Sequence, residues 1–164
     1  MILYLVRHGI AIDRTDPKSP PEPERALTAK GVQKSRLAAL GLRSLGVKPD
    51  AVITSPYVRA AQTAEIFAET LGFSLGKISV SEALKPAANP AEILKEIAQL
   101  KAKEIACFGH APHLNLLMAH LAEARGNYVE LKKAGAACLE HTSARGKWEL
   151  LWVLTPKILR ALGD

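Results

Sequence analysis

The sequence predicts an α/β fold, a three-layer α/β/α sandwich around a mostly parallel central sheet. Apolar runs of strand length alternate with longer segments in which apolar residues recur at helical spacing. The first run, residues 2–6, has no polar alternation, which is typical of a parallel strand covered on both faces. Near the C-terminus two strand-like runs follow each other without a helix between them, so we expect one antiparallel strand there.

The first half of the chain alternates strands with helices whose ends carry clear signals. Thr28 is a predicted N-cap, and Gly46 closes the helix that follows it. Ser55 and Pro56 have the residue types preferred at an N-cap and at the first helical position, and Gly72 ends that helix. The predicted elements are a strand at 2–6, a loop at 13–25, a helix at 28–45, a strand at 51–54 and a helix at 55–71.

The second half repeats this alternation and then ends in a hairpin. Asn89, Pro90 and Glu92 resemble a helix start with a capping box, and Pro112 opens a further helix. Gly146 lies in the turn of the predicted hairpin, which spans residues 143–146. The predicted elements are an edge strand at 78–81, a helix at 89–100, a strand at 105–108, a helix at 112–124 and strands at 136–141 and 148–154.

Length and composition indicate one ordinary globular domain over residues 1–164. A chain of this size buries enough surface to fold without disulfides or a structural metal. Cys107 and Cys138 lie in apolar, strand-like runs, so we expect them to be inert core thiols. No apolar stretch is long enough for a membrane span, and the N-terminal run is too short for a signal peptide, so we expect a cytoplasmic protein.

The net charge of +6 narrows the class of partner. The basic residues are scattered and aromatic residues are few, which argues against nucleic acid as the ligand. A basic surface suits anionic small molecules or phosphorylated proteins, although a merely solvated surface explains the charge equally well.

Polar and charged side chains follow the three most clearly predicted strands. Arg7 and His8 follow the first, the segment 55–59 follows the second, and His110 follows the third. Because ligands of open parallel sheets bind beyond the carboxyl ends of the strands, we expect these side chains to meet in one crevice. Arginine matches phosphate oxygens two at a time, and the start of the helix after Ser55 adds a positive end. The sequence therefore predicts a phosphate site.

The two histidines of this crevice have different expected roles. A neutral imidazole is a competent nucleophile, and nearby arginines disfavour its protonated form, so His8 is the candidate nucleophile. His110 is placed to stabilise the transferring group. His110, His113 and His120 also raise the question of a metal, but no Asp, Glu or Cys completes the set nearby. We expect neither a metal nor a cofactor.

Three motifs in this order resemble those of the histidine phosphatase superfamily, which has the phosphoglycerate mutase-like fold. They are Arg-His-Gly at 7–9, Ser-Pro-x-x-Arg-x-x-x-Thr at 55–63, and Gly-His at 109–110. The resemblance covers nearly the whole chain. Within the superfamily the short chain, which lacks a large lid insertion, looks like the SixA-type phosphohistidine phosphatases.

The resemblance implies a role for each matching residue. His8 would accept the phosphoryl group, Arg7 and Arg59 would bind its oxygens, and His110 would complete the pocket. Arg25, which precedes Leu27-Thr28, matches a further phosphate-binding arginine of such enzymes.

Glu82 falls where many superfamily members have a carboxylate that protonates the leaving oxygen. A phosphoester needs such an acid, whereas phosphohistidine has a better leaving group and SixA-type enzymes depend little on one. Glu82 is therefore either the general acid or a partner for an arginine of the pocket.

The expected substrate is a protein that bears phosphohistidine, for example a phosphotransfer domain. The alternatives are small phosphoesters such as sugar or nucleotide phosphates, or a non-catalytic phosphate-binding module. The presence of His8 argues against the last of these.

Overall fold

The computed structural model describes residues 1–124, 129–142 and 146–163 and contains one six-stranded sheet. The strand order is β3-β2-β4-β1-β5-β6, so β1 and β4 lie at the centre. The strands are β1 (Ile2–Arg7), β2 (Ala51–Thr54), β3 (Ser79–Val80), β4 (Glu104–Gly109), β5 (Ala136–Thr142) and β6 (Lys147–Leu154).

The sheet is mostly parallel, as predicted. β1 pairs in parallel with β4, β4 with β2, and β2 with β3. β5 runs antiparallel to both β1 and β6, and it is the one antiparallel strand that we expected near the C-terminus. The turn was predicted at 143–146, of which residues 143–145 lie outside the described residues.

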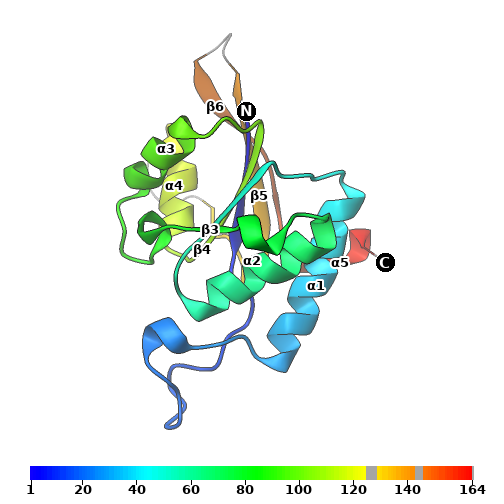
Figure 1. Cartoon of the computed structure of the whole chain (residues 1–164), viewed down its shortest axis with the longest axis vertical. Helices are drawn as coiled ribbons and strands as arrows, with labels where there is room; N and C mark the ends of the chain where they lie inside the picture. Colours follow the sequence, from blue (N-terminus) through cyan, green and yellow to red (C-terminus); the bar gives the residue numbers. More distant parts are fainter. Residues whose placement is uncertain (125–128, 143–145, 164) are drawn as a thin grey trace.

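Helices cover both faces of the sheet, which confirms the three-layer prediction. Figure 1 shows α1, α2 and α5 on one face and α3 and α4 on the other. Phe67 and Leu42 pack in the core of the first face, and Leu114 and Ile93 pack in the core of the second. The helices are α1 (Ala29–Ser44), α2 (Val58–Leu71), α3 (Pro90–Gln99), α4 (His113–Leu121) and α5 (Pro156–Leu162).

Several helix ends follow the local signals of the sequence. The Thr28 hydroxyl accepts a hydrogen bond from the Gly31 amide, and the Asn89 side chain accepts one from the Ala91 amide. Gly72 adopts a left-handed conformation (φ 75°) at the end of α2, which a residue with a Cβ atom seldom adopts. These three predicted boundaries are confirmed.

Two predicted helix boundaries and the number of helices need correction. α2 begins at Val58 rather than directly after Ser55, because Tyr57 remains extended (φ −69°, ψ 131°) and is itself the N-cap. α4 spans His113–Leu121, which is shorter than the predicted 112–124. α5 was not predicted; Thr155 caps it and Pro156 is its first residue.

Both cysteines are free and buried, as predicted. None of the helices in the described part of the chain has the length and apolar character that a membrane span requires.

Candidate active site

A pocket of about 770 Å³ lies where the carboxyl ends of the parallel strands meet. Arg7 ends β1, His110 directly follows β4, and Arg59 is the second residue of α2 after β2. The three side chains thus lie at or after the ends of three different strands and meet in one pocket. The lining residues are Arg7, His8, Ile10, Ala11, Asp13, Arg14, Glu22, Arg25, Thr28, Arg59, Pro86, His110, Ala111, Pro112 and Lys133.

His8 lies at the floor of this pocket with its ring held in one orientation. The residue is 7% exposed, and its Nδ1 atom lies 2.7 Å from the carbonyl oxygen of Gly9. Because a carbonyl only accepts hydrogen bonds, Nδ1 carries the proton and Nε2 keeps its lone pair. Nε2 is the ring atom that can act as a nucleophile.

The surroundings of His8 keep it uncharged. Burial of the ring lowers the pKa of His8 to about 3, and the positive charges of Arg59 and Arg7 act in the same direction. The hydrogen bond to Gly9 opposes this shift without cancelling it. His8 is therefore neutral, as a nucleophilic imidazole must be.

Arg59 is buried (3% exposed) and directs its guanidinium at His8. Its Nε donates to His8 Nε2 over 3.2 Å, and its Cζ lies 5.1 Å from the centre of the Tyr57 ring. Nη1 donates to the backbone carbonyl of Glu22, and Nη2 donates to the Glu22 carboxylate, each over 2.8 Å. The guanidinium thus joins the candidate nucleophile to the loop before α1.

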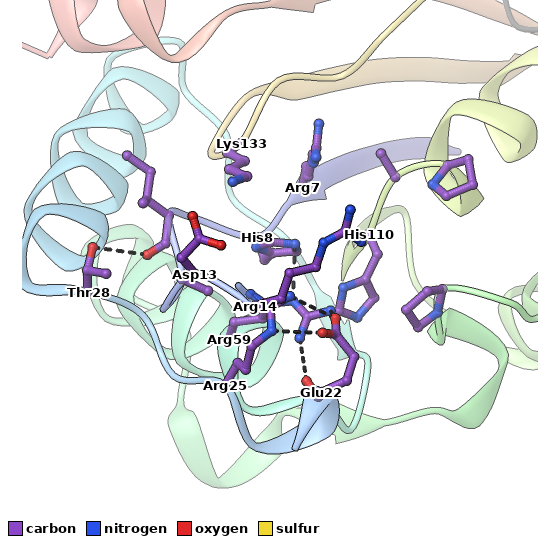
Figure 2. Close-up of a pocket in the computed structure, with 15 residues that line it drawn as sticks. Arg7, His8, Asp13, Arg14, Glu22, Arg25, Thr28, Arg59, His110 and Lys133 are labelled. Atoms are coloured by element: carbon purple, nitrogen blue, oxygen red, sulfur yellow. Dashed lines mark hydrogen bonds and ion pairs between the residues drawn. The ribbon is translucent and has the colours of Figure 1, made fainter. Parts of the chain in front are cut away.

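Arg25 and Arg59 share the carboxylate of Glu22. Arg25 donates from Nε and Nη2 to the two carboxylate oxygens, each over 2.8 Å, and from Nη1 to the carbonyl of Ile12 over 2.5 Å. The hydrogen bonds from Arg25 lower the pKa of Glu22, with a further contribution from Arg59. Figure 2 shows the carboxylate between the two guanidinium groups, where an anionic ligand would compete with it.

His110 faces His8 across the pocket. The two ring centres are 5.1 Å apart, and His110 Nε2 lies 2.9 Å from the Ser55 hydroxyl oxygen. Nδ1 of His110 is buried and has no hydrogen-bond partner among the described residues. Burial lowers the pKa of His110 strongly, and the neighbouring His8 and Arg59 add to the effect. The ring is neutral and retains unused hydrogen-bonding capacity.

Arg7 supplies a further partly free guanidinium. Its Nη1 donates to the carbonyl of Leu131 over 2.8 Å and lies 3.7 Å from the Glu130 carboxylate. Its Nε is buried without a partner among the described residues. A buried donor without a partner is costly unless a ligand accepts its hydrogen bond.

The structure brings together His8, Arg7, Arg59, His110 and Arg25, the residues that the sequence placed in one site. It does not bring Glu82 to them. Glu82 begins the short 3₁₀ helix η3 (Glu82–Leu84), its side chain is exposed, and it forms an ion pair with Lys85. The catalytic and binding roles of all these residues stay predictions.

Asp13, Arg14, Glu22 and Lys133 also line the pocket and were not singled out in the sequence. The first three lie in the loop before α1, and the composition of an irregular loop does not predict where its side chains point. The position of Lys133 could have been predicted, because an antiparallel strand begins at the edge of the sheet where its parallel neighbours end. Residues just before β5 must therefore lie beside His8.

The histidines do not form a metal site with neighbouring ligands. Within residues 1–124, 129–142 and 146–163, no three His, Cys, Asp or Glu side chains come together in a metal-binding arrangement. His113 is buried and His120 is exposed on α4.

Comparison with known sequences identifies the family of these motifs. A sequence profile described as histidine phosphatase superfamily (branch 1) matches residues 3–88, just over half of the chain. An uncharacterised protein of Picosynechococcus is 35% identical over 150 residues, which cover 88% of each chain.

Comparison with solved structures finds the same fold. The protein histidine phosphatase SixA, solved in complex with tungstate, aligns with a TM-score of 0.84 and 25% identity, covering 97% of this chain and 99% of that one. A putative phosphohistidine phosphatase SixA from Agrobacterium tumefaciens aligns with a TM-score of 0.78 and 20% identity, covering 94% of this chain and 97% of that one. A phosphoserine phosphatase of Entamoeba histolytica aligns with a TM-score of 0.76 and 17% identity, covering 96% of this chain and 98% of that one.

Proposed function

Since this chain belongs to the histidine phosphatase superfamily and its fold is of the SixA type, we propose that it hydrolyses phosphohistidine on a protein substrate through a phospho-His8 intermediate. The similarity to SixA supports a phosphohistidine donor, and the tungstate in that structure is a tetrahedral oxyanion like phosphate. The proposed reaction needs no cofactor.

In the first step His8 Nε2 attacks phosphorus in line with the leaving nitrogen. The new Nε2–P bond forms as the P–N bond of the substrate breaks, and the substrate imidazole leaves with the bond electrons. Arg7, Arg59 and Arg25 bind the oxygens of the transferring group and neutralise its charge. His110 donates a further hydrogen bond from its otherwise unpartnered ring nitrogen.

In the second step water attacks the phosphorus of phospho-His8. The Nε2–P bond breaks, its electrons return to Nε2, and inorganic phosphate leaves with the oxygen of the water. The bond between Nδ1 and the Gly9 carbonyl holds the same tautomer throughout, so His8 is ready for another cycle.

One observation favours phosphohistidine over a phosphoester: the carboxylates of the pocket are held in their ionised form. Glu22 accepts hydrogen bonds from two arginines, and Asp13 Oδ1 accepts from both the amide and the hydroxyl of Thr15. These bonds lower the pKa of each carboxyl. An alkoxide leaving group needs a proton from such a group, whereas an imidazole that is protonated on its other nitrogen leaves as a neutral ring.

The test compares turnover of a phosphohistidine peptide with turnover of phosphoserine, a sugar phosphate and p-nitrophenyl phosphate. We expect kcat/KM for the phosphohistidine peptide to exceed that for phosphoserine by at least about a hundredfold, the usual contribution of a general acid. Comparable values for the two substrates would favour the phosphoester alternative.

The variant Glu82→Gln tests whether Glu82 is the general acid. Because this side chain is exposed and paired with Lys85, we propose that it takes no part in proton transfer, and we expect unchanged kcat for the peptide and for phosphoserine. A selective loss of phosphoester turnover would instead assign Glu82 as the general acid.

A further inference from the structure

A second hollow of about 450 Å³ adjoins the active-site pocket and continues away from it. The two share Arg7, Ile10 and Lys133 as lining residues. Figure 2 shows Arg7 and Lys133 on the side of the pocket opposite Glu22. We call this hollow the basic groove; its lining residues are Arg7, Ile10, Lys34, Glu130, Lys132, Lys133, Ala134, Pro156 and Arg160.

The charge of the groove is strongly one-sided. Among the described lining residues, Glu130 is the one with a carboxylate. Lys132 Nζ lies 2.6 Å from its Oε2, and Arg7 Nη1 lies 3.7 Å from its Oε1. Within the described parts of the chain, the cations Lys34, Lys133 and Arg160 form no ion pair. Lys34 and Arg160 are half-buried and both line the groove.

These cations are held on fixed elements that are joined to the nucleophile's strand. Lys34 belongs to α1 and Arg160 to α5, and the two helices pack side by side (Figure 1). The loop with Lys132 and Lys133 is tied to β1, because the Ala134 amide donates to the carbonyls of Arg7 and His8 over 3.0 and 3.1 Å. The groove is therefore in place before any ligand arrives.

We propose that the basic groove binds acidic side chains that flank the phosphorylated residue of a polypeptide substrate. This rests on the proposed function, because it names the kind of chain that presents phosphohistidine to His8. Cations spread over two helices and a loop suit an extended segment with several carboxylates. Ile10, Ala134 and Pro156 offer apolar contact to its side-chain stems. Among the described residues, the lining has no aromatic ring on which a nucleic-acid base would stack.

The first test uses two phosphohistidine peptides, one with Glu and Asp around the phosphorylated residue and one with Gln and Asn there. For the parent protein we expect a lower KM for the acidic peptide and similar kcat. The double variant Lys34→Gln/Arg160→Gln should raise KM for the acidic peptide roughly threefold to tenfold, as expected for the loss of two partly exposed ion pairs. It should leave KM for the neutral peptide unchanged.

The matched control removes two lysines from the opposite edge of the sheet. Lys48 and Lys103 are exposed and lie near the beginning of β4, away from both hollows. Lys48→Gln/Lys103→Gln lowers the net charge equally and should leave both KM values unchanged. If the control raises KM for the acidic peptide as much as the groove variant does, overall charge rather than the groove is responsible and the proposal is overturned.

A binding measurement tests the groove without any turnover. Fluorescence anisotropy of the labelled acidic peptide without its phosphoryl group should show binding that weakens with salt and weakens threefold to tenfold in the groove variant. Equal binding by parent and variant, or tighter binding of a single-stranded oligonucleotide of the same charge, would overturn the proposal. Absence of phosphohistidine turnover together with groove-dependent peptide binding would overturn the proposed function and leave the groove supported.

Discussion

At the scale of single residues, hydrogen bonds and ion pairs within the site fix its side chains before a ligand binds. His8 is fixed by the Gly9 carbonyl on one side and meets the Arg59 Nε–H on the other. Two of the three guanidinium groups that we propose bind phosphate, those of Arg25 and Arg59, are instead engaged by Glu22. An incoming phosphoryl group must therefore replace a carboxylate that imitates its charge and its paired oxygens.

This competition predicts that Glu22→Gln binds phosphate more tightly. The amide presents one acceptor oxygen and no charge, so Arg25 and Arg59 are released for the ligand. We expect the inhibition constant of inorganic phosphate to fall by roughly threefold to tenfold, as for the loss of a partly exposed ion pair. The measurement is phosphate inhibition of p-nitrophenyl phosphate turnover.

Glu24→Gln is the matched control for this change. Glu24 lies in the same short 3₁₀ helix, Glu22–Glu24, is exposed, and is absent from the pocket lining. It should leave the inhibition constant unchanged. Weaker phosphate inhibition of Glu22→Gln would show that the carboxylate orders the arginines rather than competing for them.

Residue identities near strand ends were the most predictable part of the site. Arg7, His8, Arg59 and His110 line the pocket because β1, β2 and β4 are parallel and end at one edge. The network of Glu22 was not predictable, since it depends on how an irregular loop of about a dozen residues folds back over the strand ends.

At the scale of elements, α1 packs so closely that two of its glycines have no room for a side chain. A Cβ atom on Gly41 would overlap the carbonyl oxygen of Leu159 in α5, and one on Gly31 would overlap the carbonyl oxygen of Ile10. Gly41 therefore sets the distance between α1 and α5, and these helices carry Lys34 and Arg160 of the basic groove.

We predict that Gly41→Ala destabilises the protein although alanine favours a helix by about 1 kcal/mol over glycine. The overlap with Leu159 is with backbone, which cannot rotate away, so α5 must shift at a cost of about 1–3 kcal/mol. Urea denaturation measures the free energy of unfolding.

Gly76→Ala is the control, because a Cβ atom there meets open space. Its free energy of unfolding should stay within about 0.5 kcal/mol of the parent value. An increase in stability for Gly41→Ala would contradict the account of this helix contact.

Periodicity and capping residues predicted the strands and most helix ends. The start of α2 differed because the Ser55 hydroxyl faces His110 and the chain stays extended through Tyr57. α5 was missed because a seven-residue segment is too short to show helical periodicity; the packing of Leu159 against α1 stabilises it.

At the scale of the whole molecule, a neutral site that is buried beneath a cationic surface has consequences for stability. Burial lowers the pKa of His8, His110 and His113. As pH falls through about 6.5, the unfolded chain takes up protons on these histidines while the folded chain does not. The contribution of these histidines to the free energy of unfolding is fully present above that pH and is lost progressively below it.

We therefore predict that the free energy of unfolding falls between pH 7 and pH 5, by up to about 1.4 kcal/mol per pH unit for each such histidine. His113 lies outside the pocket lining, so His113→Gln should flatten this dependence without removing the nucleophile. Urea denaturation at several pH values measures it. A free energy of unfolding that is equal at pH 7 and pH 5 would contradict the neutral, buried state of these rings.

The most direct test of the central claim is to trap the phosphoryl group on His8. The protein is incubated with phosphoramidate, quenched in alkali, digested and analysed by mass spectrometry. We expect one phosphoryl group on the peptide that contains His8, and none in His8→Ala, whose urea denaturation should show a folded protein. A phosphoryl group on another residue, or turnover that persists in His8→Ala, would contradict the mechanism.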